Sequence, residues 1–236
     1  MHPYDACMTE ARVAFSGHMT QMMARLDRLP LVFFLVFYPA LSAQMHRTIA
    51  CRLSRVLSHH TDDLPHAALL TRQSEWFQAY AKQLTQDAQA WLMAVTARGE
   101  APASTAKALL SVPDMPSMTS IVTQCDALLE IEKGRIDIVP VIYEWQRARI
   151  LQGAGLIQTV HQTLGRFSLR HFQFLHRKLW RAPSCSVLSP DEFHQFLAQH
   201  PEILVSVVEL SSIFLAKFSE FLDDCVCLAE NAANHI

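Results

Sequence analysis

The chain has 236 residues, of which 50% are hydrophobic and only 18% charged, and its net charge is −2 at neutral pH. Soluble domains usually carry about 25% charged residues, so part of the apolar surface is expected to lie against a partner, a second subunit or lipid. The charge balance argues against a general nucleic-acid binder, and six glycines are few for a strand-rich fold, whose turns and bulges need them.

The N-terminal part of the chain is expected to form one mixed amphipathic helix over residues 4–28 and a second over residues 30–57, kinked or restarted at Pro39. Residues 29–43, at the start of the second helix, are uncharged and almost wholly apolar. About 15 apolar residues make roughly 22 Å of helix, short of the ~30 Å of a hydrocarbon core. The length favours a buried core helix and leaves an interfacial segment or a membrane span as alternatives. Three rings of this run are candidates for an apolar interface or insertion surface: Phe33, Phe34 and Phe37.

A third helix is expected over residues 65–97, with Gly99 as the residue that ends it. Residues 99–117 contain three prolines and form the candidate linker. Helical spacing resumes over residues 118–133 and again from about residue 140, where Gly153, Gly155 and Gly165 are expected to bend or end the helix. Ser-Pro-Asp-Glu at residues 189–192 is a strong helix start, with Ser at the N-cap, Pro at N1 and Glu at N3. A short helix to residue 199 and a last one from residue 201 to about 230 complete the chain.

Charge is unevenly distributed near the C-terminus. Residues 161–181 hold five cations and no acid, whereas residues 182–236 hold eight acids and one lysine, a net −7. The cations are candidates for binding a protein partner or lipid headgroups: Arg166, Arg170, Arg177, Lys178 and Arg181. The last helix adds an apolar seam with candidate interface rings: Phe214, Phe218 and Phe221. Three interpretations remain open, namely that the two segments neutralise one another, that the cations meet anionic lipid, or that they meet an acidic protein.

Residues 59–66, HHTDDLPH, hold ligand types suited to zinc or a similar metal. The low-ranked metal candidates are His59, His60, Asp63 and His66, and a capped loop between helices is the stronger interpretation. No serine-hydrolase elbow, phosphate-binding loop, HExxH motif or dinucleotide fingerprint occurs in the chain. The six cysteines lack C-x-x-C spacing and no secretory signal opens the chain, so reduced thiols and a cytoplasmic protein are expected, with membrane association as the alternative.

The sequence therefore predicts an all-α bundle of about six to eight helices, forming one domain over residues 1–236 with a candidate linker at 99–117. The favoured function is a non-enzymatic adaptor or subunit that binds a protein partner or a second copy of itself. A protein that binds the membrane surface is the first alternative and a metal-dependent helical enzyme the second. No cofactor is expected, and nucleic acid is an unfavoured partner.

Overall fold

The computed structural model describes residues 2–59, 67–97, 99, 115–130, 138–164 and 188–234, and these form an all-α bundle. The prediction of the fold class is confirmed. Within these residues there are eight α-helices and one short 3-10 turn, as follows: α1 (Pro3–Cys7), α2 (Thr9–Arg25), α3 (Arg28–His59), α4 (Ala67–Ala97), α6 (Pro116–Glu130), α7 (Ile138–Leu164), α9 (Pro190–Gln199), the turn η2 (Pro201–Ile203) and α10 (Leu204–Asn234).

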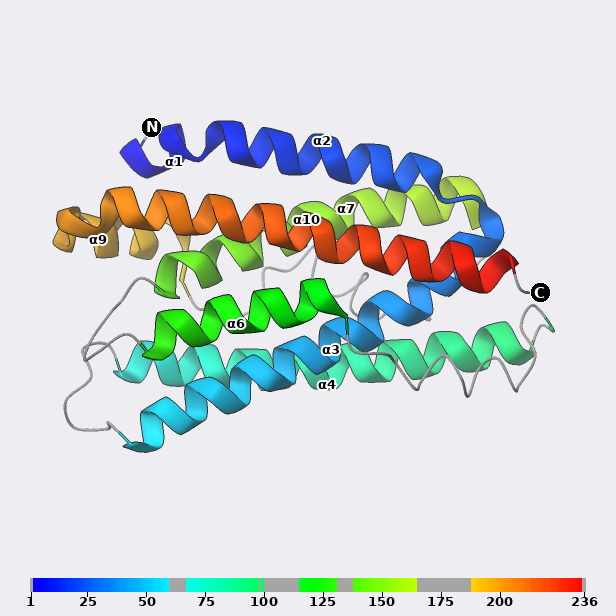
Figure 1. Cartoon of the computed structure of the whole chain (residues 1–236), viewed down its shortest axis with the longest axis horizontal. Coiled ribbons are helices and arrows are strands. Elements are labelled where there is room, and N and C mark those ends of the chain that lie inside the picture. Colours follow the sequence, from blue (N-terminus) through cyan, green and yellow to red (C-terminus); the bar gives the residue numbers. More distant parts are fainter. Residues whose placement is uncertain are drawn as a thin grey trace.

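The long helices lie in layers roughly along the long axis of the molecule (Figure 1). Helix α2 forms one edge and packs against both α7 and α10. Helix α3 runs obliquely across the bundle, pairs with α4 over much of its length and also packs against α10. Helix α6 contacts α3 and α10 in the middle of the molecule, so α10 touches most other layers.

Helix α3 is the apolar helix that raised the question of a membrane span. It continues without interruption through Pro39, although proline removes the backbone donor to the Leu35 carbonyl. By length and composition it is the one helix of the described residues that could cross a membrane, and 78% of its most apolar window is buried inside the bundle. The indole Nε1 of Trp91 on α4 donates a hydrogen bond of 2.9 Å to the carbonyl of Val32. In this bundle α3 therefore serves as a core helix.

The core joins α3 to α10 through stacked aromatic rings. Tyr38 stacks on Phe34 at 5.4 Å between ring centroids and contacts Phe221 of α10 at 6.3 Å. Phe218 then stacks on Phe221 at 6.0 Å. Because α10 presents its apolar seam at spacings of three and four, one face of this helix is enclosed while the opposite face stays in water.

Local sequence signals fix several helix ends as predicted. The Ser189 hydroxyl accepts a hydrogen bond from the Glu192 amide at 3.2 Å, and the Glu192 carboxylate accepts one from the Ser189 amide at 2.7 Å. This capping box holds the pKa of Glu192 below its usual value, because the hydrogen bonds favour the charged carboxylate. Gly99 follows α4 with φ of 69°, the left-handed conformation that favours glycine at a helix end.

Two expectations about helix boundaries are wrong. The predicted first helix is divided at Met8 into α1 and α2. Helix α7 continues through Gly153 and Gly155 to Leu164, because a helical glycine costs only about 1 kcal/mol and buried side chains such as Leu156 and Val160 hold the helix on the bundle. The region expected as a linker lies largely outside the described residues, and α6 already begins at Pro116 within it.

Candidate functional site: a groove between α2 and α7

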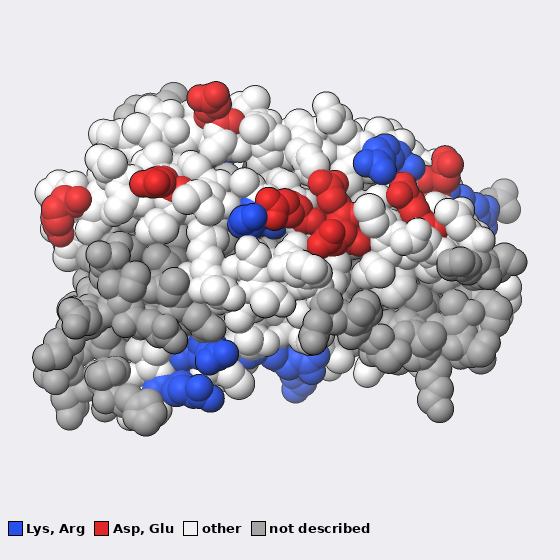
Figure 2. Space-filling model, in the orientation of Figure 1, with Lys and Arg blue, Asp and Glu red and all other residues white. Residues whose placement is uncertain are grey.

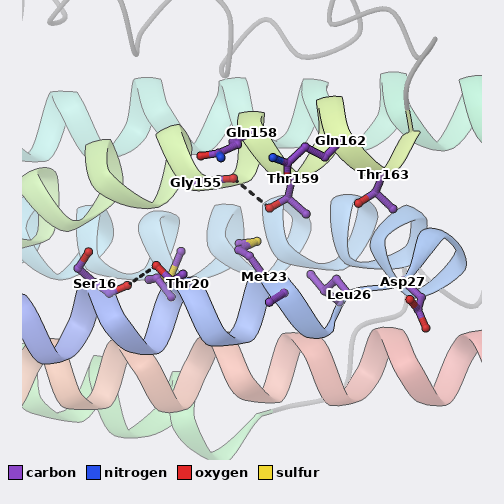
Figure 3. Close-up of a pocket in the computed structure, with 12 residues that line it drawn as sticks. Ser16, Thr20, Met23, Leu26, Asp27, Gly155, Gln158, Thr159, Gln162 and Thr163 are labelled. Atoms are coloured by element: carbon purple, nitrogen blue, oxygen red, sulfur yellow. Dashed lines mark hydrogen bonds between the residues drawn. The ribbon is translucent and has the colours of Figure 1, made fainter.

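A groove of about 500 Å³ lies between the C-terminal half of α2 and the C-terminal half of α7 (Figure 3). Binding sites for small molecules and peptide side chains usually enclose about 300–1,000 Å³, so the groove is within the useful range. Its wall on α2 runs from Ser16 to Asp27, and its wall on α7 runs from Gly155 to Thr163. In this view Ser16, Thr20 and Met23 of α2 reach toward the space between the two ribbons, as do Thr159 and Thr163 of α7, whereas the side chain of Asp27 points away from α7.

The lining of the groove is polar but almost uncharged. Hydroxyl and amide groups form the rim, and thioether and alkyl groups form the floor. Rim and floor consist of Ser16, Thr20, Gln158, Thr159, Gln162 and Thr163, with Met19, Met23 and Leu26 beneath them. Asp27 is the single charged residue in the lining, at the end of the α2 wall.

Helical spacing explains why these groups share the groove. On α7, Gln158 and Gln162 are one turn apart, as are Thr159 and Thr163, so both pairs lie on one side of the helix. The Thr20 hydroxyl donates to the Ser16 carbonyl at 3.0 Å, and the Thr159 hydroxyl donates to the Gly155 carbonyl at 3.1 Å (Figure 3). The protons of these two hydroxyls are thus used within their own helices, which leaves their lone pairs as acceptors.

Because Gly155 has no side chain, the α7 side of the groove is open at this position. A Cβ atom added to Gly155 would find no other atom within 4 Å, so the position opens into free space. The backbone of α7 is consequently approachable there, as it would not be beside a larger side chain. The side chains of Gln158, Gln162 and Thr163 make no hydrogen bond to the described part of the chain and can donate to or accept from a bound group.

An ion pair connects α2 to α7, and its α2 residue lies one helical turn before the first lining residue of that helix. The Arg12 guanidinium binds both carboxylate oxygens of Glu144, with Nε 3.2 Å from Oε2. The side chain of Glu144 is only 1% exposed and that of Arg12 only 11%. The Tyr4 hydroxyl lies 3.1 Å from both Glu144 Oε1 and Ser211 Oγ of α10. These contacts lock α1, α2, α7 and α10 together at one end of the groove.

A second carboxylate extends this network toward α9. Asp5 Oδ1 accepts a hydrogen bond of 2.7 Å from Arg12, and Asp5 Oδ2 lies 2.7 Å from Nε2 of His194, whose ring stacks on His2 at 4.4 Å. Burial tends to raise the pKa of Asp5, but the charge and hydrogen bond of Arg12, aided by His194, outweigh burial and lower it. For Tyr4, burial and the nearby Glu144 charge raise the pKa well above its usual value. These charges are mutually satisfied, as in a structural network.

The outer side of α10 carries an acidic ridge, defined here as Glu220, Asp223, Asp224 and Glu230. Figure 2 shows acidic side chains grouped over α10 with a few cations beside them, and further cations along the edge formed by α3 and α4. His18 of α2 lies 3.1 Å from Asp223, and Arg25 lies 3.6 Å from Glu230. At ~100° per residue, His18 and Arg25 project from the face of α2 opposite Ser16 and Thr20. The groove and the acidic ridge therefore flank the same helix.

The predicted apolar interface rings lie inside the bundle. Phe37 is 6% exposed, and the other five rings are fully enclosed: Phe33, Phe34, Phe214, Phe218 and Phe221. In this structure none of the six presents a surface to a partner or to lipid, because each is packed against rings or alkyl groups of neighbouring helices.

The other predicted site residues lie outside what the structure describes. This applies to the five cations Arg166, Arg170, Arg177, Lys178 and Arg181, to His60, Asp63 and His66, and to the side chain of His59. Within the described ranges, no group of three or more histidine, cysteine or acidic side chains is arranged to hold a metal ion.

Sequence reasoning missed both the groove and its ion pair. One signal for the pair was present, because Glu144 interrupts the apolar run 138–145 and an acid there needs a buried cation. Its partner Arg12 could not be identified, since it lies 132 residues away. The hydroxyl pairs that line the groove look like ordinary solvent-facing helix positions in the sequence.

Fold and site together define an all-α bundle with a polar, almost uncharged surface groove beside an acidic ridge. This chain matches no family model, no curated protein and no solved structure.

Proposed function

We propose that this protein is a non-enzymatic helical interaction module, an adaptor or subunit that holds a segment of a partner protein in the groove between α2 and α7. The observation that carries the proposal is the groove itself, about 500 Å³ of space with unused hydrogen-bonding groups on its rim and an apolar floor. Such a lining can hold a peptide by hydrogen bonds to its backbone and by contacts to its side chains.

The chemistry of the lining suits holding a segment rather than breaking a bond. Asp27 is the only titratable lining residue, and the hydroxyls of Thr20 and Thr159 donate to carbonyls of their own helices. A catalytic site would need a nucleophile within reach of a base, or paired titratable groups. Only 18% of the residues are charged, and this low share also suits a protein with part of its surface covered in an assembly.

The test is site-specific photocrosslinking in cells that make the protein. A benzophenone amino acid replaces Gln162 on the groove rim of the full-length chain, and adducts are compared between two backgrounds. Gly155→Leu fills the groove, whereas Ala79→Leu adds the same side chain at an exposed position of α4, a helix that does not line the groove. The proposal expects a discrete protein adduct that Gly155→Leu removes and Ala79→Leu leaves. Equal adducts in both backgrounds, or none with the unaltered groove, would overturn it.

A further inference from the structure

We infer that the partner segment is an uncharged polar stretch that continues into lysine or arginine residues, with the uncharged part in the groove and the cations on the acidic ridge of α10. This inference rests on the proposed function, because it names the chemistry of the partner that the groove would hold. Two separate features of the molecule support it: the lining of the groove and the charges on the opposite flank of α2.

The groove selects against charge in the segment that enters it. Its floor of Met19, Met23 and Leu26 would desolvate a charged side chain, and the lining offers only Asp27, at one end, as a compensating charge for a cation. The rim offers amides and hydroxyls, which pair equally well with serine, threonine, asparagine, glutamine and backbone groups. A partner segment with small or amide side chains therefore fits best, and an acidic one fits worst because Asp27 stands at the end of the wall.

The acidic ridge selects for cations next to that segment. Helices α9 and α10, with the turn η2 between them, carry eight acids against the single cation Lys217, which is bound to Glu220 at 2.9 Å. Asp224 has no ion-pair partner in the described part of the chain. On the ridge itself Glu220 is exposed and the other three carboxylates are half-buried. Grouped carboxylates attract basic segments and repel acidic ones over about a Debye length, ~10 Å at 0.1 M salt.

The two features are close enough for one segment to reach both. They flank α2, and a helix with its side chains is about 10–12 Å across, a distance that about four extended residues span. Gly17 lies on the outer surface of α2 between the groove and the acidic ridge and carries no side chain. An added Cβ atom there would meet nothing within 4 Å. A partner backbone can therefore cross α2 from the groove to the ridge without a bulky side chain in its way.

The experiment selects peptides from a phage-displayed random 12-residue library on the purified full-length protein, with Gly155→Leu and Ala79→Leu proteins selected in parallel. The inference expects enriched peptides with an uncharged polar core flanked by lysine or arginine, lost with Gly155→Leu and kept with Ala79→Leu. One enriched peptide is then measured by fluorescence anisotropy at low and high salt.

The expected affinities separate the two features. Gly155→Leu should weaken the peptide roughly tenfold or more by occupying its site. The double change Asp223→Asn with Asp224→Asn should weaken it about two- to tenfold at low salt, with little effect in 1 M salt. Wholly apolar or acidic peptides that depend on Gly155 would overturn the inferred partner chemistry while supporting the groove as a docking site. Peptides that bind Gly155→Leu as tightly as the unaltered protein, or no enrichment at all, would overturn the use of the groove and the inference with it.

Discussion

The Arg12 guanidinium donates hydrogen bonds to both carboxylate oxygens of Glu144. Glu144 is 132 residues away in the sequence, and its side chain is almost fully buried. The pair joins α2 to α7 at the point from which the groove opens. Tyr4 covers one side, with the Arg12 guanidinium carbon 5.5 Å from the centroid of its ring. This contact and the packing of α2 on α10 together hold α2 on the bundle.

Removing the cation should be strongly destabilising. Arg12→Met leaves the Glu144 carboxylate buried without its charged partner, which typically costs about 3–5 kcal/mol of unfolding free energy. Urea unfolding followed by circular dichroism measures the loss. In the double variant Arg12→Met with Glu144→Gln the carboxylate charge is gone, so the loss should be clearly smaller than for Arg12→Met alone. An equal loss in both would mean that the packing of Arg12, rather than its charge, is what matters.

Tyr4 predicts a loss of stability at alkaline pH. Its pKa is raised in the folded protein, while in the unfolded chain it stays near 10. The contribution of Tyr4 is therefore complete below about pH 10 and declines as the pH rises toward the folded pKa, by about 1.4 kcal/mol per pH unit. Urea unfolding between pH 8 and 11 should show a steeper decline for the native protein than for Tyr4→Phe, which cannot ionise. Parallel curves would contradict the assigned environment of Tyr4.

Phe34→Glu distinguishes a core helix from a membrane-inserted one. Phe34 is enclosed, so a carboxylate there would be buried without a partner, at a cost of several kcal/mol. We expect the variant to lose its cooperative thermal unfolding. Val13→Glu, at a position 67% exposed, should keep it. If Phe34→Glu instead stayed folded and detached the protein from membranes in a flotation gradient, α3 would be an insertion surface.

Ser189→Ala should weaken the start of α9 by about 1 kcal/mol, since it removes the acceptor for the Glu192 amide. The measurement is the urea midpoint of the full-length chain at constant m-value. Ser58→Ala, at an exposed position of α3, serves as the control and should change stability by less than about 0.5 kcal/mol. If Ser189→Ala also changed the unfolding free energy by less than about 0.5 kcal/mol, α9 would be held by its tertiary contacts rather than by its cap.

Gly155→Ala and Gly17→Ala should each stabilise the protein by about 0.5–1 kcal/mol. Both glycines are within helices, and an added methyl group would meet no atom within 4 Å at either position. Alanine reduces the entropy of the unfolded chain without creating a clash. Thermal or urea unfolding checks the gain. A loss of stability at Gly155 would mean that α7 cannot accept a side chain on its groove face.

Much of the helix layout was predictable because it depends on the spacing of capping, glycine and apolar residues that are close in the sequence. The capping box at Ser189, the glycine that follows α4 and the apolar seam of α10 each depend on residues within a few turns of one another. Helix α3 contains Pro39 within a single helix, in the range where the sequence predicted one. The error at α7 arose where packing overrides local preference: the helix continues through Gly155, because buried side chains such as Leu156 and Val160 hold it on the bundle.

Periodicity and charge can be read along one chain, so the all-α class, the main helices and the accumulation of acids toward the C-terminus were predictable from the residues alone. The folded bundle was needed to show that Arg12 meets Glu144, that the apolar run of α3 is enclosed, and that a groove with mostly uncharged walls lies between α2 and α7. A groove is a distance between helices. That distance is set by contacts between residues more than a hundred positions apart, and no local pattern records it.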